Sequence, residues 1–250
     1  MRCLVLGHSG TAGFGLSSLA ETWPVLFEKR LAAHGPGQWG VSSVPLHPVG
    51  SRAADYALSR VEASRPDLVV LSLNAYPCVV PVVSASVRQR FGRRAERLYN
   101  RTERVFERVS SRRGPGASAV NRVGRGLGRR LLGARPLATV DEVGNVYREI
   151  LRRLASSEGV QVVVLAEAMF GEGVRNRVPS IEREATRLQG MVRPVAEEHR
   201  FLWCDATEWL APDGGSSFWQ SDDVHLSARG NTRYAEMLEA SLQGRLPEPN

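Results

Sequence analysis

The sequence predicts an α/β fold, namely a flavodoxin-like three-layer α/β/α sandwich with a mainly parallel sheet of about five strands. The alternation of strand-like and helix-like runs, together with the handedness of βαβ units, predicts this fold. Short apolar, β-branched runs alternate along the chain with longer runs in which apolar residues recur at helical spacing. Strands separated by helices form right-handed βαβ units, so the strands should be parallel and the helices should cover both faces of the sheet.

The predicted elements alternate from the start of the chain. The runs predicted as strands are residues 2–6, 41–44, 67–73, 160–165 and 201–204. The runs predicted as helices are residues 16–33, 53–64, 139–157, 180–199 and 227–243. Glycines are frequent between residues 7 and 15, and they allow the chain to turn sharply where the first strand ends.

Length and composition favour one domain over residues 1–250, because 250 residues can bury one complete core. The hydrophobic content of 42% is ordinary for a soluble globular protein. Three scattered cysteines are too few for a disulfide framework or a zinc site. No signal peptide precedes the first strand and no transmembrane run is present, so we expect a cytoplasmic location.

Residues 86–135 interrupt the alternation and hold the excess positive charge. They contain fifteen arginines and three glutamates, a net +12, so the rest of the chain carries 7 − 12 = −5. Apolar residues recur at partly helical spacing over residues 87–109, whereas residues 114–133 contain six glycines. We interpret residues 86–135 as a basic helical lid inserted in the domain, with a flexible return.

The positive charge of this insertion does not by itself identify a binding partner. It is compatible with docking to an acidic partner, such as an acyl carrier protein or a phosphorylated substrate, or to an anionic membrane surface. An arginine-rich solvated helix without a partner is equally compatible. Nucleic acid is disfavoured, because the segment lacks a recognisable binding motif and interleaved aromatic residues.

Polar side chains in three separate motifs have the chemistry of a serine hydrolase. Ser9 follows the first predicted strand, Asn74 follows the third, and Asp222 and His225 precede the last helix. A serine hydroxyl needs an imidazole to accept its proton, and the imidazole needs a carboxylate to orient it. Ligands of parallel sheets bind at the carboxyl ends of the strands, so Asn74 could donate its amide N–H to an oxyanion beside Ser9.

Each of these residues also has a plain structural interpretation. Asn74 could cap the turn that follows it. Asp222 or Asp223 could cap the last helix. His8 could perturb Ser9 electrostatically, or it could pack or form a hydrogen bond under the loop.

Taken together and in this order, the motifs resemble those of the SGNH, or GDSL-type, hydrolase family. Residues 4–15 are similar to the first block of the family, 48–55 to the second, 71–75 to the third and 222–225 to the fifth. The resemblance implies a serine nucleophile at Ser9, a triad completed by His225 and Asp222, and an oxyanion hole formed by Ser9, Gly50 and Asn74. It covers nearly the whole chain.

The sequence departs from the family at His8, Ser72 and Ala75, where the family usually has aspartate, glycine and aspartate. None of these changes removes a proton-transfer or oxyanion group. We therefore predict an esterase-, lipase- or deacylase-type acyl hydrolase that acts on a small ester or acylated substrate through an acyl-serine intermediate. An acyltransferase with the same triad and an inactive binding protein on the same fold are the alternatives.

Neither a cofactor nor a metal is expected. The glycine-rich loop after the first strand lacks the spacing of a dinucleotide fingerprint, and it lacks the lysine of a P-loop.

Overall fold

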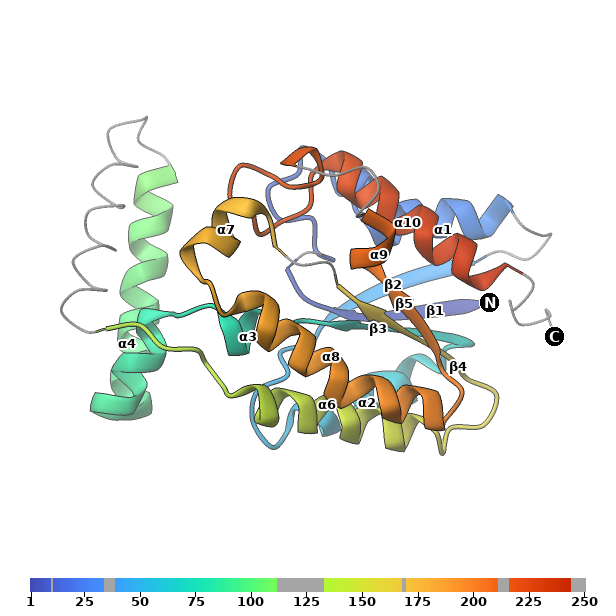
Figure 1. The fold of residues 1–250 in the computed structure, drawn as a ribbon, viewed down its shortest axis with the longest axis horizontal. Coiled ribbons are helices and arrows are strands. Elements are labelled where there is room, and N and C mark those ends of the chain that lie inside the picture. The colour runs from blue at the N-terminus through green and yellow to red at the C-terminus, as the bar shows by residue number, and fades with distance from the viewer. Residues whose placement is uncertain (10, 34–38, 112–132, 168–169, 211–215, 244–250) are drawn as a thin grey trace. The chain divides into compact units, whose positions relative to one another are not determined.

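The computed structural model describes residues 1–9, 11–33, 39–111, 133–167, 170–210 and 216–243. Five strands form one sheet in the order β2-β1-β3-β4-β5, and every neighbouring pair is parallel (Figure 1). The strands are β1 (Arg2–Gly7), β2 (Gly40–Pro45), β3 (Leu68–Leu73), β4 (Gln161–Ala166) and β5 (Leu202–Asp205). This sheet confirms the predicted α/β fold.

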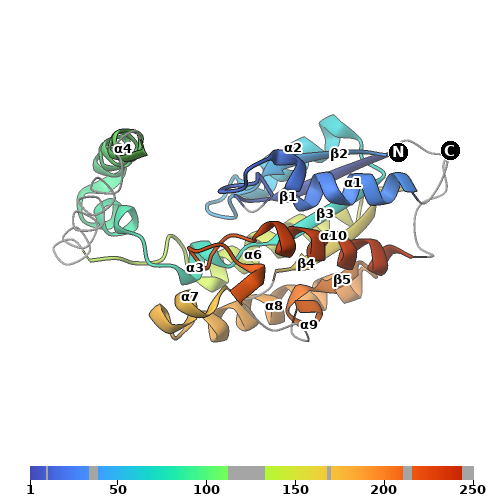
Figure 2. The ribbon, with the colours of Figure 1, turned by 90° about the horizontal axis from the view of Figure 1, so that it is seen from above.

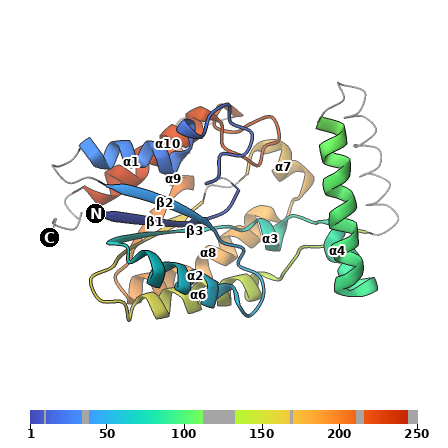
Figure 3. The same ribbon diagram turned by 180° about the vertical axis from the view of Figure 1, so that it is seen from behind.

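Helices cover both faces of the sheet, as Figure 3 shows from behind. One face is covered by α1 (Trp23–Ala33), α9 (Ala206–Leu210) and α10 (Ala228–Leu242). The other face is covered by α2 (Ala53–Ser64), α6 (Val140–Leu154) and α8 (Ile181–Glu198). The shorter helices are η1 (Leu19–Glu21), α3 (Tyr76–Val79), α7 (Glu172–Arg177) and η3 (Ser216–Phe218).

The strand order reverses direction between β1 and β3. From β1 the chain passes to β2 on one side, and it then returns to β3 on the other side. Leu6 of β1 pairs with Val44 of β2 and with Leu71 of β3, so the carboxyl ends of these strands lie at one edge of the sheet. A reversal of this kind opens a crevice at that edge, where ligands of α/β proteins bind.

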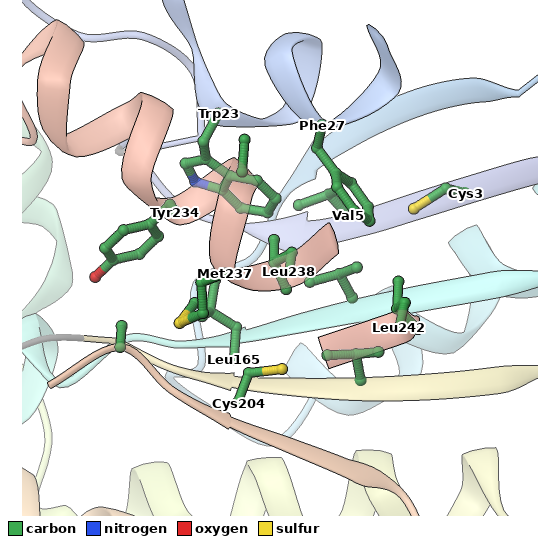
Figure 4. Packing of buried hydrophobic residues seen from close by; sticks show 14 of the residues in the cluster. Cys3, Val5, Trp23, Phe27, Leu165, Cys204, Tyr234, Met237, Leu238 and Leu242 are labelled. Carbon is green, nitrogen blue, oxygen red and sulfur yellow. The ribbon is translucent and has the colours of Figure 1, made fainter. Parts of the chain in front are cut away.

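A hydrophobic core cluster lies between the sheet and the pair α1 and α10, which run alongside each other (Figure 2). Trp23 and Phe27 of α1 and Leu238 of α10 point toward β1 and β4 (Figure 4). Cys3 and Val5 of β1 face this cluster, because alternate side chains of a strand point to the same face. The α10 helix is thereby fixed over the sheet, and the loop before it is fixed as well.

The first helix differs from the prediction at its beginning. Residues 16–33 were expected to be one helix, but α1 begins at Trp23 and only the short η1 precedes it. Pro24 explains the difference. Proline has no backbone N–H and clashes with the carbonyl four residues earlier, so it is compatible with the first turn of a helix but not with its interior.

Two compact units divide the chain. The first comprises residues 1–77 and 140–250 and contains the sheet, and the second comprises Cys78–Thr139. In the second unit α4 (Val83–Ser111) bends at Gly92, whose φ of 80° and ψ of 176° are not helical. Phe91 and Leu98 of α4 are exposed. The glycine-rich part of the predicted lid lies almost entirely outside the described residues.

Three further predictions concern cysteines, metals and membranes. Cys3, Cys78 and Cys204 are all buried, as small apolar side chains would be. Within the described ranges, no cluster of three or more His, Cys, Asp or Glu side chains could hold a metal ion. None of the described helices combines the length and the apolar character needed to span a bilayer.

Candidate active site

Ser9 and His225 are brought together from opposite ends of the chain. Ser9 follows β1 and is exposed, and its Oγ lies 3.1 Å from Nε2 of His225. His225 belongs to the loop between η3 and α10, 216 residues later in the sequence. This distance allows the hydroxyl of Ser9 to donate its proton to the imidazole.

Asp222 orients the imidazole of His225. Its Oδ2 lies 2.6 Å from Nδ1 of His225, and its Oδ1 accepts hydrogen bonds from the backbone N–H groups of Val224 and His225 at 2.9 and 3.0 Å. Because an ionised carboxylate only accepts, the proton of neutral His225 lies on Nδ1, and the lone pair of Nε2 faces Ser9. This tautomer is the one that a general base requires.

The same hydrogen bonds stabilise the charge of Asp222. Burial opposes ionisation, but the N–H donors of His225 and Val224 outweigh it, so the pKa of Asp222 lies below its ordinary value of 3.8. Asp222 is therefore ionised at neutral pH.

Asp223 has a different place from Asp222. Its backbone has a φ of 59°, and its carbonyl oxygen accepts a hydrogen bond from Gly171 N at 2.8 Å. Its carboxylate packs against Gly171 and Gly173, where a Cβ on either glycine would lie within 2.4 Å of it. Neither aspartate caps the last helix, because Ser227 does so through Gly230 N. Asp222, which the family resemblance implies, is therefore the aspartate that contacts His225.

Gln220 joins the loop that carries Ser9 to the loop that carries His225. Its side-chain Nε2 donates to the carbonyl oxygens of Phe14 and Leu226, both at 2.9 Å, and its backbone N–H donates to the His225 carbonyl at 2.8 Å. The Phe14 ring lies on the imidazole of His225, with 4.7 Å between the ring centroids. The side chain of Gln220 thus connects the loop of Ser9 to the loop of His225.

A buried asparagine anchors the start of the last helix. Asn231 accepts a hydrogen bond from Trp23 N at 2.9 Å and donates to the carbonyl oxygens of Leu226 and Ser227. Its side chain therefore links the beginning of α1 to the residues directly after His225. The position of His225 consequently depends on the packing of α10 against α1.

Asn74 and Gly50 lie on either side of Ser9 at the same sheet edge, since they follow β3 and β2. Oδ1 of Asn74 accepts from Tyr76 N at 2.8 Å, and this local bond leaves Nδ2 as the donor group of the amide. The backbone N–H of Asn74 donates to the hydroxyl of Tyr147 at 2.8 Å. Gly50 has a φ of 89°, a conformation that favours glycine.

His8 and Ser72 share an acceptor that the sequence analysis did not identify. Oε1 of Glu167 forms hydrogen bonds with Nε2 of His8 and with Oγ of Ser72. Burial disfavours the imidazolium of His8, but the charge and hydrogen bond of Glu167 outweigh burial, so the pKa of His8 lies above its ordinary value of 6.5. Glu167 directly follows β4, so the rule that selected Ser9 and Asn74 would also have selected it.

Comparison with protein-family models shows which family the chain belongs to. The model of the GDSL-like Lipase/Acylhydrolase family matches residues 5–233, which include the loops of both Ser9 and His225. The chain belongs to the GDSL-like lipase/acylhydrolase family. Membership of this family supports a hydrolase of the esterase kind. No curated protein matches the chain in sequence.

Solved structures of similar fold include a lipase/acylhydrolase and an acetyl xylan esterase. The structure titled "Crystal Structure of TesA" has a TM-score of 0.58 and 17% identity, covering 98% of this chain and 99% of that one. A lipase/acylhydrolase from Enterococcus faecalis has a TM-score of 0.57 and 16% identity, with coverages of 100% and 98%. The acetyl xylan esterase AlAXEase has a TM-score of 0.56 and 13% identity, with coverages of 97% and 100%. At these identities the likeness concerns the fold alone.

Two of the departures from the GDSL family pattern are explained by Glu167. His8 and Ser72 do not leave gaps in the site, because both side chains are bonded to this one carboxylate. Of the two interpretations of His8, the hydrogen bond under the loop is therefore observed. The raised pKa of His8 also favours its positively charged form one residue before Ser9. Nothing in the structure explains Ala75.

Proposed function

We propose that the chain is a serine acyl hydrolase in which Ser9 is the nucleophile, His225 the general base and acid, and Asp222 the orienting carboxylate. The observation that carries the proposal is the continuous hydrogen-bonded line from Asp222 Oδ2 through the His225 ring to Ser9 Oγ. Membership of an acylhydrolase family supports the same chemistry.

In the proposed reaction, Ser9 Oγ forms a bond to the carbonyl carbon of an ester while its proton moves to His225 Nε2. The tetrahedral intermediate then breaks the bond to the leaving alcohol, which takes the proton from His225. Water attacks the acyl-serine in the second half, and His225 again accepts a proton and returns it to Ser9 Oγ. The products are a carboxylic acid and an alcohol.

The proposed oxyanion hole consists of the backbone N–H groups of Ser9 and Gly50 and the Nδ2 amide of Asn74. The flanking positions of Gly50 and Asn74 at the sheet edge support this assignment. Loss of one such donor typically costs about 10²- to 10³-fold in kcat. We expect Asn74→Ala to lower kcat by that order.

A fluorophosphonate probe tests the proposal, together with p-nitrophenyl esters of increasing acyl length. The parent should be labelled and should turn over esters, whereas Ser9→Ala should do neither. Ser59→Ala is the matched control, because Ser59 is an exposed serine of α2. A parent that is neither labelled nor active would instead identify the chain as a binding protein on this fold.

The acceptor in the second half-reaction distinguishes a hydrolase from an acyltransferase. Alcohols or amines could attack the same acyl-serine as water does, because His225 would accept their proton in the same way. Product analysis of a turnover in water with added alcohol measures the partition. Free acid as the main product supports hydrolysis, and a new ester as the main product supports transfer.

For residues 86–135, the lid and its binding of an acidic partner or an anionic surface remain proposals from the sequence. Exposed guanidinium groups on the described part of α4 support an electrostatic role. These groups belong to Arg88, Arg90, Arg94, Arg97 and Arg101.

Retention on a phosphate or heparin matrix tests this role of α4. The test variant replaces three of its arginines with glutamine, and a control variant replaces three exposed arginines of α8, so that both lose the same formal charge. The replaced residues are Arg90, Arg94 and Arg97 in the test variant and Arg183, Arg187 and Arg193 in the control. Equal retention of the two variants would contradict a binding surface on α4.

A further inference from the structure

One carboxylate oxygen connects three neighbouring strands at the sheet edge that carries Ser9. Oε1 of Glu167, which follows β4, accepts hydrogen bonds from His8, which follows β1, and from Ser72 near the end of β3. β1, β3 and β4 are consecutive in the sheet. The side chains of Glu167 and His8 are only 19% and 17% exposed, so water competes little for these bonds.

The two partners of Glu167 lie one and two residues before residues of the proposed site. His8 is bonded covalently to Ser9, and Ser72 lies two residues before Asn74. The hydroxyl of Tyr147 donates to the Ser72 carbonyl at 3.2 Å and accepts from Asn74 N, so it fixes the end of β3 from a second direction. A shift of His8 relative to Ser72 must therefore stretch a bond to Glu167, and these two residues are close in sequence to Ser9 and Asn74.

Charge strengthens the connection between His8 and Glu167. Because the pKa of His8 is raised, the imidazolium persists above the pH at which an ordinary histidine becomes neutral. Hydrogen bonds between ionised groups are about twice as strong as neutral ones. Loss of either partner would leave the other charge poorly solvated.

We propose that Glu167 is a positioning residue that holds His8 and Ser72 together and thereby sets the separation between Ser9 and the oxyanion donor Asn74. The proposal rests on the proposed function. It explains two departures from the family pattern together, because His8 and Ser72 are the two residues whose side chains donate hydrogen bonds to Oε1 of Glu167. Glu167 acts through these residues and does not itself carry out a step of the reaction.

The decisive experiment is a kinetic double-mutant cycle between Glu167 and Asn74. Glu167→Gln keeps a side chain of the same shape but removes the charge, and we expect kcat to fall about 10- to 100-fold, the scale of a small misplacement of reacting groups. KM should stay within about twofold, because the variant should weaken stabilisation of the transition state and leave binding of the substrate in its ground state unchanged. Glu149→Gln, at an exposed position of α6, is the control and should change neither constant.

The cycle separates positioning from a general loss of stability. If Glu167 positions Asn74, Glu167→Gln should have little further effect on kcat in an Asn74→Ala background, because the donor is already absent. Losses that multiply would overturn the proposal, as would a single variant with unchanged kcat. Should Glu167→Gln fail to fold, Ser72→Ala decides in its place, since it removes one hydrogen bond and keeps the charge pair.

Two variants of His8, one that keeps a hydrogen-bond donor and one that lacks it, test the part played by this residue. His8→Gln retains a donor near the position of Nε2, so we expect it to keep most of the activity. His8→Leu has a similar size without a donor and should lose activity to the extent that Glu167→Gln does. Equal activity of the two His8 variants would contradict the proposal. Absence of labelling and turnover in the parent would instead refute the proposed function itself.

Discussion

Gln220 Nε2 lies 2.9 Å from the carbonyl oxygen of Phe14, and this hydrogen bond ties the loop of Ser9 to the loop of His225. The two residues are 206 positions apart in the sequence. The same nitrogen also donates to the Leu226 carbonyl. The short distance between Ser9 and His225 is therefore supported by a second connection between the same loops.

Removal of the Gln220 side chain should lower activity more than stability. Gln220→Ala frees the two loops from each other, and we expect kcat for an ester to fall about tenfold or more, since positioning of the reacting groups is lost. Gln243→Ala, which truncates an exposed glutamine after α10, is the control. Retention of full kcat by Gln220→Ala would show that the loops are held without this side chain.

Gly15→Ala should destabilise the protein. Gly15 has a φ of 77°, and a Cβ there would lie 2.1 Å from Oε1 of Gln220. We expect the free energy of unfolding to fall by about 1–3 kcal/mol from backbone strain alone. Gly40→Ala is the control, because a Cβ there meets no atom within 4 Å. Urea denaturation measures both variants, and equal stabilities would contradict the prediction.

The ring of Phe14 should stabilise the positive charge that His225 would acquire in the proposed reaction. An aromatic face contributes about 0.5–1 kcal/mol to an exposed cation, which corresponds to about two- to fivefold in kcat. Phe14→Leu should show this loss, and Phe14→Tyr should not, because it keeps an aromatic face. Phe14 is 64% exposed, so neither variant should alter the thermal midpoint appreciably. Similar kcat values for the two variants would contradict a role of the ring.

The ion pair of His8 should make stability depend on pH above 6.5. Because the pKa of His8 is raised in the folded protein, its contribution is complete below the unfolded value of about 6.5, and it is lost as the pH rises through the folded pKa. The free energy of unfolding of the parent, minus that of His8→Gln, should therefore decrease with rising pH above 6.5. A constant difference across that range would contradict the prediction.

Local patterns predicted the elements that depend on local physics. The bounds of α2 agree with the predicted helix at 53–64, because its apolar spacing is regular and no proline interrupts it. The start of α1 was wrong, since the apolar spacing continued across Pro24 while the backbone could not. The contact between Asp222 and His225 was predictable, because only two residues separate them.

Contacts across the whole chain were harder to predict. Glu167 lies 159 residues from His8, and no periodicity or spacing relates the two. The sheet order, which brings β1, β3 and β4 side by side, is what makes them partners. Gln220 was missed for the same reason, since a glutamine in a loop resembles any solvated side chain until its acceptors are known.

The late position of His225 has a consequence for biosynthesis. During synthesis the hydroxyl of Ser9 is made 216 residues before the imidazole of His225, so the two groups cannot form a hydrogen bond until both have been made. Even then the His225 loop is held only when α10 packs against α1, and this requires α10 to have left the ribosome. The proposed pair of Ser9 and His225 therefore cannot form in a growing polypeptide that still lacks α10.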